Sequence, residues 1–167
     1  NKPIVENSVT VTGECFPKQA NLLVRVGTPL QYIIDYLGGM PADAVKVISG
    51  GPMMGKAIAN LDAATLKGTS ALLFLTAKQT ARGKEGNCIR CGKCAEACPM
   101  GLEPFLLNRL SRAGGMLDAL EENAVQDCIE CGCCLYSCPA NIPLLDVIRQ
   151  SKAQVMGVIR ARAAAKK

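Results

Sequence analysis

Cysteine is the residue type in this 167-residue sequence whose spacing is most suited to chemistry. Nine of the ten cysteines lie in two short windows, and each window contains the spacing C-x2-C-x2-C-x3-C-P. The first window holds Cys88, Cys91, Cys94 and Cys98, and the second holds Cys128, Cys131, Cys134 and Cys138. Three thiolates at this spacing can wrap a tight loop around one cube of iron and sulfide. The sequence therefore predicts two 4Fe-4S clusters.

The fourth cysteine of each window is expected to bind the other cluster. It precedes a proline and begins the next segment, and in this motif its side chain points at the second cube. The first cluster would take Cys88, Cys91, Cys94 and Cys138, and the second would take Cys128, Cys131, Cys134 and Cys98. The windows are repeats of one another, offset by 40 residues from Cys88 to Cys128.

Zinc sites and disulfides are the alternative uses of these cysteines. A zinc ribbon is built from two C-x2-C pairs and has no use for the third and fourth cysteines or the proline. Disulfides are spread along a chain and form in oxidising compartments, whereas these cysteines are crowded together. Cys133, which stands where the first window has Lys93, is expected to be a small buried filler, the alternative being a ligand or redox-active thiol. Cys15 is expected to be structural.

The remaining composition excludes several classes of protein. The sequence contains no histidine, so it has no imidazole base, no Ser-His-Asp triad and no histidine-ligated metal, and we expect no catalytic site of its own. The formal net charge of +5 would fall to about +1 with two clusters, since each contributes about −2. Nucleic-acid binding is therefore not expected. No apolar run reaches the ~20 residues of a membrane span. The first residues, Asn-Lys-Pro-Ile, suggest a piece of a longer protein.

The residues before the cysteine windows predict a small α+β domain over 1–80. Alternating or apolar runs predict strands over 8–12, 21–26, 44–48 and 71–75. Apolar residues at helical spacing after Thr28-Pro29 predict a helix that Thr28 caps and that Gly38-Gly39 ends. Two strands, a helix and further strands are typical of a β-grasp fold. The Gly-rich segment 49–56 lacks the hydroxyl of a phosphate loop. It is expected to serve backbone packing, or alternatively to meet a flavin or a redox domain.

The polar segment 76–87 is expected to separate this unit from a second domain over 81–167. Helices are predicted from Pro104 towards Gly114-Gly115, over Met116 to Glu122, and from an Asn141 cap to the C-terminal region. The second domain is thus expected to be a helical two-cluster ferredoxin-type domain.

Taken together, these residues resemble the C subunit of the Rnf electron-transport complex. The resemblance rests on Gly27-Thr28-Pro29, Gly50-Gly51-Pro52-Met53-Met54-Gly55, the stretch from Leu61-Asp62 to Thr69, the strand Ala71 to Leu75 and both cysteine windows. It implies an SLBB (β-grasp) domain followed by the two-cluster ferredoxin domain, with the part that binds FMN and NADH preceding this sequence.

The resemblance also implies a function. It implies a peripheral subunit on the cytoplasmic face of a prokaryotic cell membrane, partnered by other subunits of a membrane redox complex and by a ferredoxin-like donor subunit. The complex would couple ferredoxin:NAD+ electron transfer to Na+ or H+ pumping, and this segment would relay single electrons. The alternatives are a cobalamin reductase subunit of a bacterial microcompartment and an iron-sulfur regulatory or interaction module.

Overall fold

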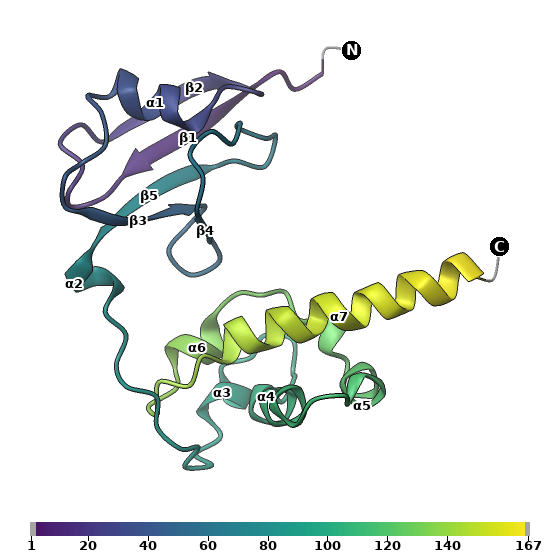
Figure 1. Ribbon diagram of the computed structural model, residues 1–167. Helices are drawn as coiled ribbons and strands as arrows, with labels where there is room; N and C mark the ends of the chain where they lie inside the picture. Colours follow the sequence, from purple (N-terminus) through teal and green to yellow (C-terminus); the bar gives the residue numbers. More distant parts are fainter. Residues whose placement is uncertain (1–2, 166–167) are drawn as a thin grey trace. The chain divides into compact units, whose positions relative to one another are not determined.

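The computed structural model describes residues 3–165, which form two compact units (Figure 1). The first unit runs to Ala81 and the second begins at Arg82. None of the helices within the described residues combines the length and the apolar character needed to cross a bilayer. The first unit contains a sheet and the second is helical, so the expected α+β class is confirmed.

The first unit is a five-stranded mixed sheet with one main helix. Its elements are β1 (Glu6–Thr12), β2 (Ala20–Arg25), α1 (Leu30–Tyr36), β3 (Ala44–Ser49), β4 (Lys56–Ile58), β5 (Ala71–Thr76) and the short α2 (Ala77–Thr80). The strand order is β2-β1-β5-β3-β4, in which β1 and β5 are parallel and the other neighbours antiparallel. An N-terminal hairpin, a helix and a later strand parallel to β1 agree with the β-grasp expectation.

The core of this unit lies between the sheet and α1. Alternation along β1 buries Val9 and Val11, while Leu72 and Phe74 on β5 are fully buried. Helix α1 adds Leu30, Ile33 and Ile34 to the same cluster. The rings of Phe16 and Phe74 pack with their centroids 4.6 Å apart. Four strands and one helix, which the apolar patterns predicted, thus share a single hydrophobic core.

The start of α1 differs from the expectation. Its N-cap is Pro29, and the Thr28 hydroxyl donates to the Arg25 carbonyl at 2.8 Å, so Thr28 does not cap the helix. The hydroxyl instead fixes the turn that leads out of β2. The predicted end is confirmed, since Gly38 and Gly39 have φ of 110° and 94°, which glycine adopts without strain.

The Gly-rich segment between β3 and β4 is a tight connection. Gly55 donates its N–H to the Gly51 carbonyl at 2.8 Å, and a Cβ on Gly55 would lie 2.4 Å from the Ile48 side chain. The absence of a side chain at Gly55 is therefore needed for packing. This geometry agrees with the packing interpretation of the segment.

The second unit packs short helices against one long helix. Its elements are α3 (Lys93–Glu96), α4 (Pro104–Ala113), α5 (Leu117–Glu122), the 3-10 helix η1 (Val125–Asp127), α6 (Cys133–Tyr136) and α7 (Leu144–Ala165). Helix α7 contacts α4, α5, α6 and η1. The buried apolar core that they share is Leu107, Leu120, Val125, Ile142, Leu144, Ile148 and Val155. Helices α3 and α6 lie within the two cysteine loops and contact one another.

The start of α7 also corrects an expectation. Asn141 is not its cap, because the helix begins at Leu144 and Asn141 has a left-handed φ of 52°. Asn141 stands 40 residues after Gly101, whose φ is 65°. Asparagine tolerates this backbone region better than most residues. Asn141 therefore occupies a left-handed backbone position that the two repeats have in common.

Candidate iron-sulfur site

The duplication seen in the sequence is repeated in the backbone of the two cysteine loops. Arg90 and Glu130 each precede the second cysteine of their loop, and both have φ of 57°. Gly92 and Gly132 follow that cysteine, with φ of 77° and 82°, and each caps a four-residue helix. Turns with left-handed residues direct successive backbone N–H groups into one concave space, which suits an anionic cluster. The conformation, rather than lack of space, demands glycine at position 92, where an added Cβ would contact nothing within 4 Å.

Four cysteines from both loops line one cavity of the second unit. This cavity has a volume of about 540 Å³. Its cysteines are Cys88, Cys91, Cys94 and Cys138, three from the first window and the fourth from the second. Cys88 and Cys91 are exposed, whereas Cys94 and Cys138 are half-buried. The structure therefore brings together the set expected for the first cluster.

The other four cysteines line a second, narrower cavity of about 20 Å³. They are Cys98, Cys128, Cys131 and Cys134, again three from one window and one from the other. Cys134 is buried and the rest are half-buried. Apart from the cysteines, glycine and proline, the lining is aliphatic, and no charged residue takes part. The set expected for the second cluster is thus also assembled, in a more enclosed setting.

A backbone contact explains how the first set comes together. The N–H of Gly86 donates to the carbonyl of Ala140 at 2.8 Å. These two residues lie two positions from Cys88 and Cys138 respectively. A Cβ on Gly83 would lie 2.5 Å from the Asn141 side chain, so the segment before the first window runs tightly beside the end of the second. This contact places the two distant parts of the chain at one cavity.

Burial raises the pKa of several of these thiols. The pKa of Cys134 is raised to about 12, mainly because the side chain is removed from water. Burial also raises the pKa of Cys94 and of Cys128, and hydrogen bonds from backbone groups offset part of this rise. A buried thiol of high pKa stays protonated at neutral pH, so a metal that binds there must displace the proton.

A half-buried charge network ties α7 to the second loop. Arg149 Nε lies 2.9 Å from Glu130 Oε2, and Lys152 Nζ lies 3.7 Å from Glu130 Oε1. Lys152 also donates to the Cys128 carbonyl at 2.6 Å, and its charge lowers the pKa of Cys128. These contacts hold the second loop against the long helix. Sequence reasoning missed them, although Glu130 in place of Arg90 was a visible signal.

The two cysteines outside the sets have separate positions. Cys133 is half-exposed rather than buried, which corrects the expectation of a buried filler. A hydrogen bond with Cys131 raises the pKa of its thiol. Cys15 packs against the core of the first unit, and its thiol donates to the Phe74 carbonyl at 3.7 Å. Gly13 allows this close approach, since a Cβ there would lie 2.3 Å from the Phe74 carbonyl oxygen.

The donor sets fit iron-sulfur clusters in number and in kind. Each cavity is lined by four thiols, the number of ligands that a 4Fe-4S cube takes. Within residues 3–165, no three cysteine, aspartate or glutamate side chains are grouped closely enough to hold a single metal ion. At the narrow second cavity, the fit rests on the donor set and the loop conformation.

Two family models match the chain. Residues 8–57 match the SLBB domain, and residues 80–139 match the 4Fe-4S dicluster domain. The first match lies in the β-sheet unit, and the second covers both cysteine loops. The expected fold, an SLBB-like domain followed by a ferredoxin-type domain, is therefore confirmed, and the second domain is one that carries iron-sulfur clusters.

Curated relatives extend the similarity over most of the chain. The chain is 46% identical over 152 residues to the C subunit of the proton-translocating ferredoxin:NAD(+) oxidoreductase complex of Clostridium ljungdahlii. The aligned residues make up 91% of this chain and 33% of that protein. It is 44% identical over 154 residues to the C subunit of the ion-translocating oxidoreductase complex of Rhodobacter capsulatus, covering 92% and 30%. The chain is 42% identical over 154 residues to the C subunit of the Na(+)-translocating ferredoxin:NAD(+) oxidoreductase complex of Acetobacterium woodii, and the aligned residues make up 92% of this chain and 34% of that protein. The chain spans about a third of the length of these relatives.

Proposed function

We propose that this chain is an electron relay. An SLBB domain precedes a 4Fe-4S dicluster domain in it, and it resembles the C subunit of Rnf-type complexes. Two 4Fe-4S clusters would supply reversible one-electron chemistry. The protein's part is to hold them at fixed positions, to limit their exposure to water and to set their electrostatic surroundings.

The assembly of two cross-linked thiol sets is the observation that carries this proposal. We assign Cys88, Cys91, Cys94 and Cys138 to one cluster, and Cys128, Cys131, Cys134 and Cys98 to the other. Because each loop gives one ligand to the other site, neither loop can move away without breaking both sets. Such coupling keeps the distance between two redox centres short and constant, which is what a relay of single electrons needs.

The domain organisation supports the same proposal. We place the boundary at 80/81, and the division of the structure after Ala81 supports it. The first unit contains no cysteine window and has its own core, whereas the second contains all eight proposed ligands. We therefore assign electron transfer to the second unit and a supporting or docking role to the first.

The wider setting is also part of the proposal. Similarity to components of multi-subunit complexes supports other subunits of such a complex as partners. We further propose a ferredoxin-like donor among these partners and a peripheral place on the cytoplasmic face of the membrane. The names of the relatives support ferredoxin:NAD+ electron transfer coupled to ion pumping as the activity of the whole complex. We place FMN and NADH outside these 167 residues, in the part of the relatives that this chain does not match.

Metal analysis of anaerobically purified protein tests this proposal. We expect about eight irons and eight sulfides per chain. After reduction, the EPR spectrum should show spin-spin interaction between two paramagnetic clusters. Stoichiometric zinc without iron would contradict the cluster assignment, and about four irons would contradict the count of two.

A further inference from the structure

The two cysteine cavities differ in exposure. In the first, Cys88 and Cys91 are exposed at the surface, and Ile89 between them is 68% exposed. In the second, Cys134 is buried and the other three cysteines are half-buried. Electron transfer slows steeply as the protein between two centres thickens. The first cavity is therefore the better port for exchange with another protein.

The two cavities also differ in charge. Arg90, Arg109 and Arg112 line the first cavity, and no acidic residue lines it. No charged residue lines the second cavity. Arg112 is paired with Glu85 at 2.6 Å, whereas Arg90 and Arg109 are exposed and make no ion pair within residues 3–165. The exposed cluster site is thus rimmed by cations that the rest of the described chain does not neutralise.

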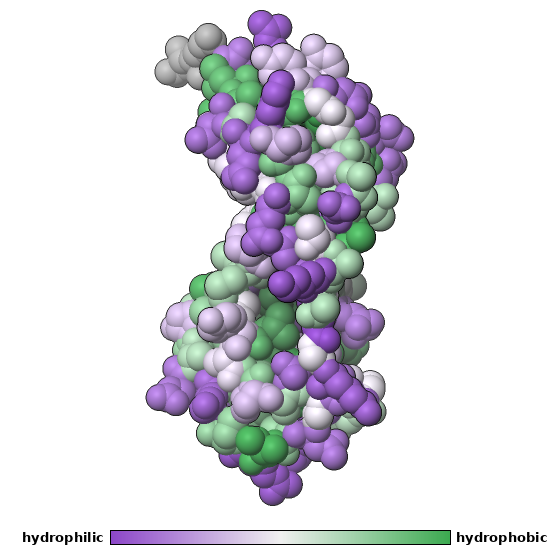
Figure 2. Space-filling view, turned by 90° about the vertical axis from the view of Figure 1, so that its left-hand side faces the viewer, coloured by the Kyte–Doolittle hydropathy of each residue, from purple (hydrophilic) through white to green (hydrophobic). Residues whose placement is uncertain are grey.

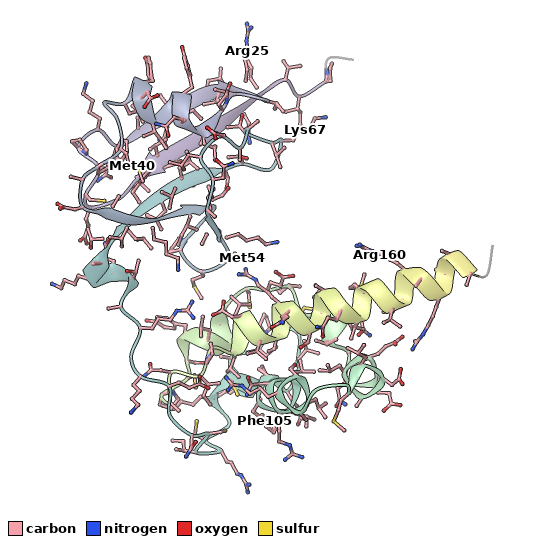
Figure 3. All side chains as sticks on the ribbon, in the orientation of Figure 1. Arg25, Met40, Met54, Lys67, Phe105 and Arg160 are labelled. Atoms are coloured by element: carbon pink, nitrogen blue, oxygen red, sulfur yellow. The ribbon has the colours of Figure 1, made fainter. Side chains whose placement is uncertain are left out.

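Apolar side chains complete this rim. Phe105, which α4 contributes (Figure 3), is 41% exposed and lines the first cavity together with Ile89. Figure 2 shows hydrophobic and hydrophilic side chains interspersed over one face of the molecule. Exposed apolar residues within a charged rim are typical of protein docking sites.

We propose that the rim formed by Arg90, Arg109, Ile89 and Phe105 docks an acidic protein that carries one electron at a time. The inference rests on the proposed function, because it requires a cluster in the first cavity. One electron passes from the reduced carrier to the oxidised cluster, and no bond or proton changes place. The basic rim speeds the encounter with an acidic surface, and Ile89 and Phe105 provide the apolar contact next to the exposed cysteines.

Charge reversal in the protein with both clusters bound tests the proposal. The variant Arg90→Glu/Arg109→Glu is suited to this, since Glu130 occupies the same backbone conformation as Arg90 in the second loop. The matched control is Lys18→Glu/Lys67→Glu, which changes the net charge equally but alters exposed residues of the first unit. The probe is a reduced, strongly acidic 2Fe-2S ferredoxin, and stopped-flow absorbance gives the second-order rate of electron transfer.

The expected result is a rate that falls as salt rises. Between about 10 mM and 500 mM salt, the wild-type rate should drop at least about tenfold, because screening removes the attraction. At low salt, the double variant should be at least about tenfold slower than wild type, and the control should match wild type. The cluster potentials of wild type and the double variant, measured by redox titration, and their rates at high salt should be equal if the variant affects only the electrostatic attraction. A difference in either would indicate a change in driving force.

Two outcomes would overturn the proposal. One is a wild-type rate that does not fall with salt, and the other is an equal loss of rate in the control. If the double variant does not bind iron, Arg109→Glu alone lies outside the cysteine loop and should slow the reaction roughly threefold at low salt. Protein that contains no iron would refute the proposed function itself, whereas iron-loaded protein with a salt-independent rate would refute only the docking rim.

Discussion

Truncation of Phe74 should destabilise the first unit without releasing the clusters of the second. Phe74 lies on β5, is fully buried and packs on Phe16 with a centroid distance of 4.6 Å. A Phe→Ala change at such a site costs about 3–5 kcal/mol. A unit of this size is stable by about 4–12 kcal/mol, at about 0.05–0.15 kcal/mol per residue. The variant Phe74→Ala therefore removes a large fraction of the stability of this unit.

The effect can be measured on the protein with clusters bound. A loss of about 3 kcal/mol should lower the melting temperature of the β-sheet unit by at least about 12 °C, because 1 kcal/mol shifts a domain of this size by about 4–8 °C. Hydrogen exchange in β1, β3 and β5 reports on this unit, and visible absorbance reports on the clusters. The matched variant is Leu107→Ala, which opens the core of the second unit and should release the clusters earlier. Cluster loss at the same lowered temperature in Phe74→Ala would refute the independence of the two units.

Three further perturbations address the second unit and its dependence on iron. Glu130→Gln removes the carboxylate between Arg149 and Lys152, so we expect the clusters to be released at a lower urea concentration. The free energy of unfolding should fall by about 1 kcal/mol. An unchanged urea midpoint would show that the network does not hold the loop. Gly92→Ala should destabilise the cluster-bound protein by about 1–2 kcal/mol through backbone strain alone. Gly51→Ala should be nearly neutral in the same urea titration, because Gly51 has no left-handed φ and a Cβ there would contact nothing within 4 Å. Removal of iron should abolish exchange protection in the cysteine loops but not in β1 and β5; equal loss in both would mean that the sheet depends on the clusters.

The sequence predicted those elements that carry a periodic apolar pattern. The strands around Val9, Val47 and Phe74 and the helices around Ile33 and Leu107 all follow from such patterns. Strand β4 was missed because three residues at a sheet edge are too few to show alternation. Helices α3 and α6 are single turns within the cysteine loops, so they too lack a period. Their positions depend on the left-handed turns at Gly92 and Gly132.

The cysteines that share each cavity could be predicted from the sequence, but the surroundings of the two cavities could not. The motif spacing alone indicated which cysteines would meet. The exposure of Cys88 and the burial of Cys134 were not predictable, because they depend on how α4 and α7 pack around the loops. The cationic rim is likewise formed by Arg90 in a loop and Arg109 on a helix, residues that only the folded chain brings to one cavity. Asn141 was misinterpreted because asparagine suits both a helix cap and a left-handed turn.

The exchange of the fourth ligand is the central claim, and EPR spectra of four single variants test it most directly. Cys91→Ser marks the first cluster and Cys131→Ser marks the second, since each lies within its own loop. Cys98→Ser should then give the spectrum of Cys131→Ser, and Cys138→Ser should give that of Cys91→Ser. If Cys98→Ser instead reproduced the spectrum of Cys91→Ser, each loop would bind its own fourth cysteine and the account would be contradicted.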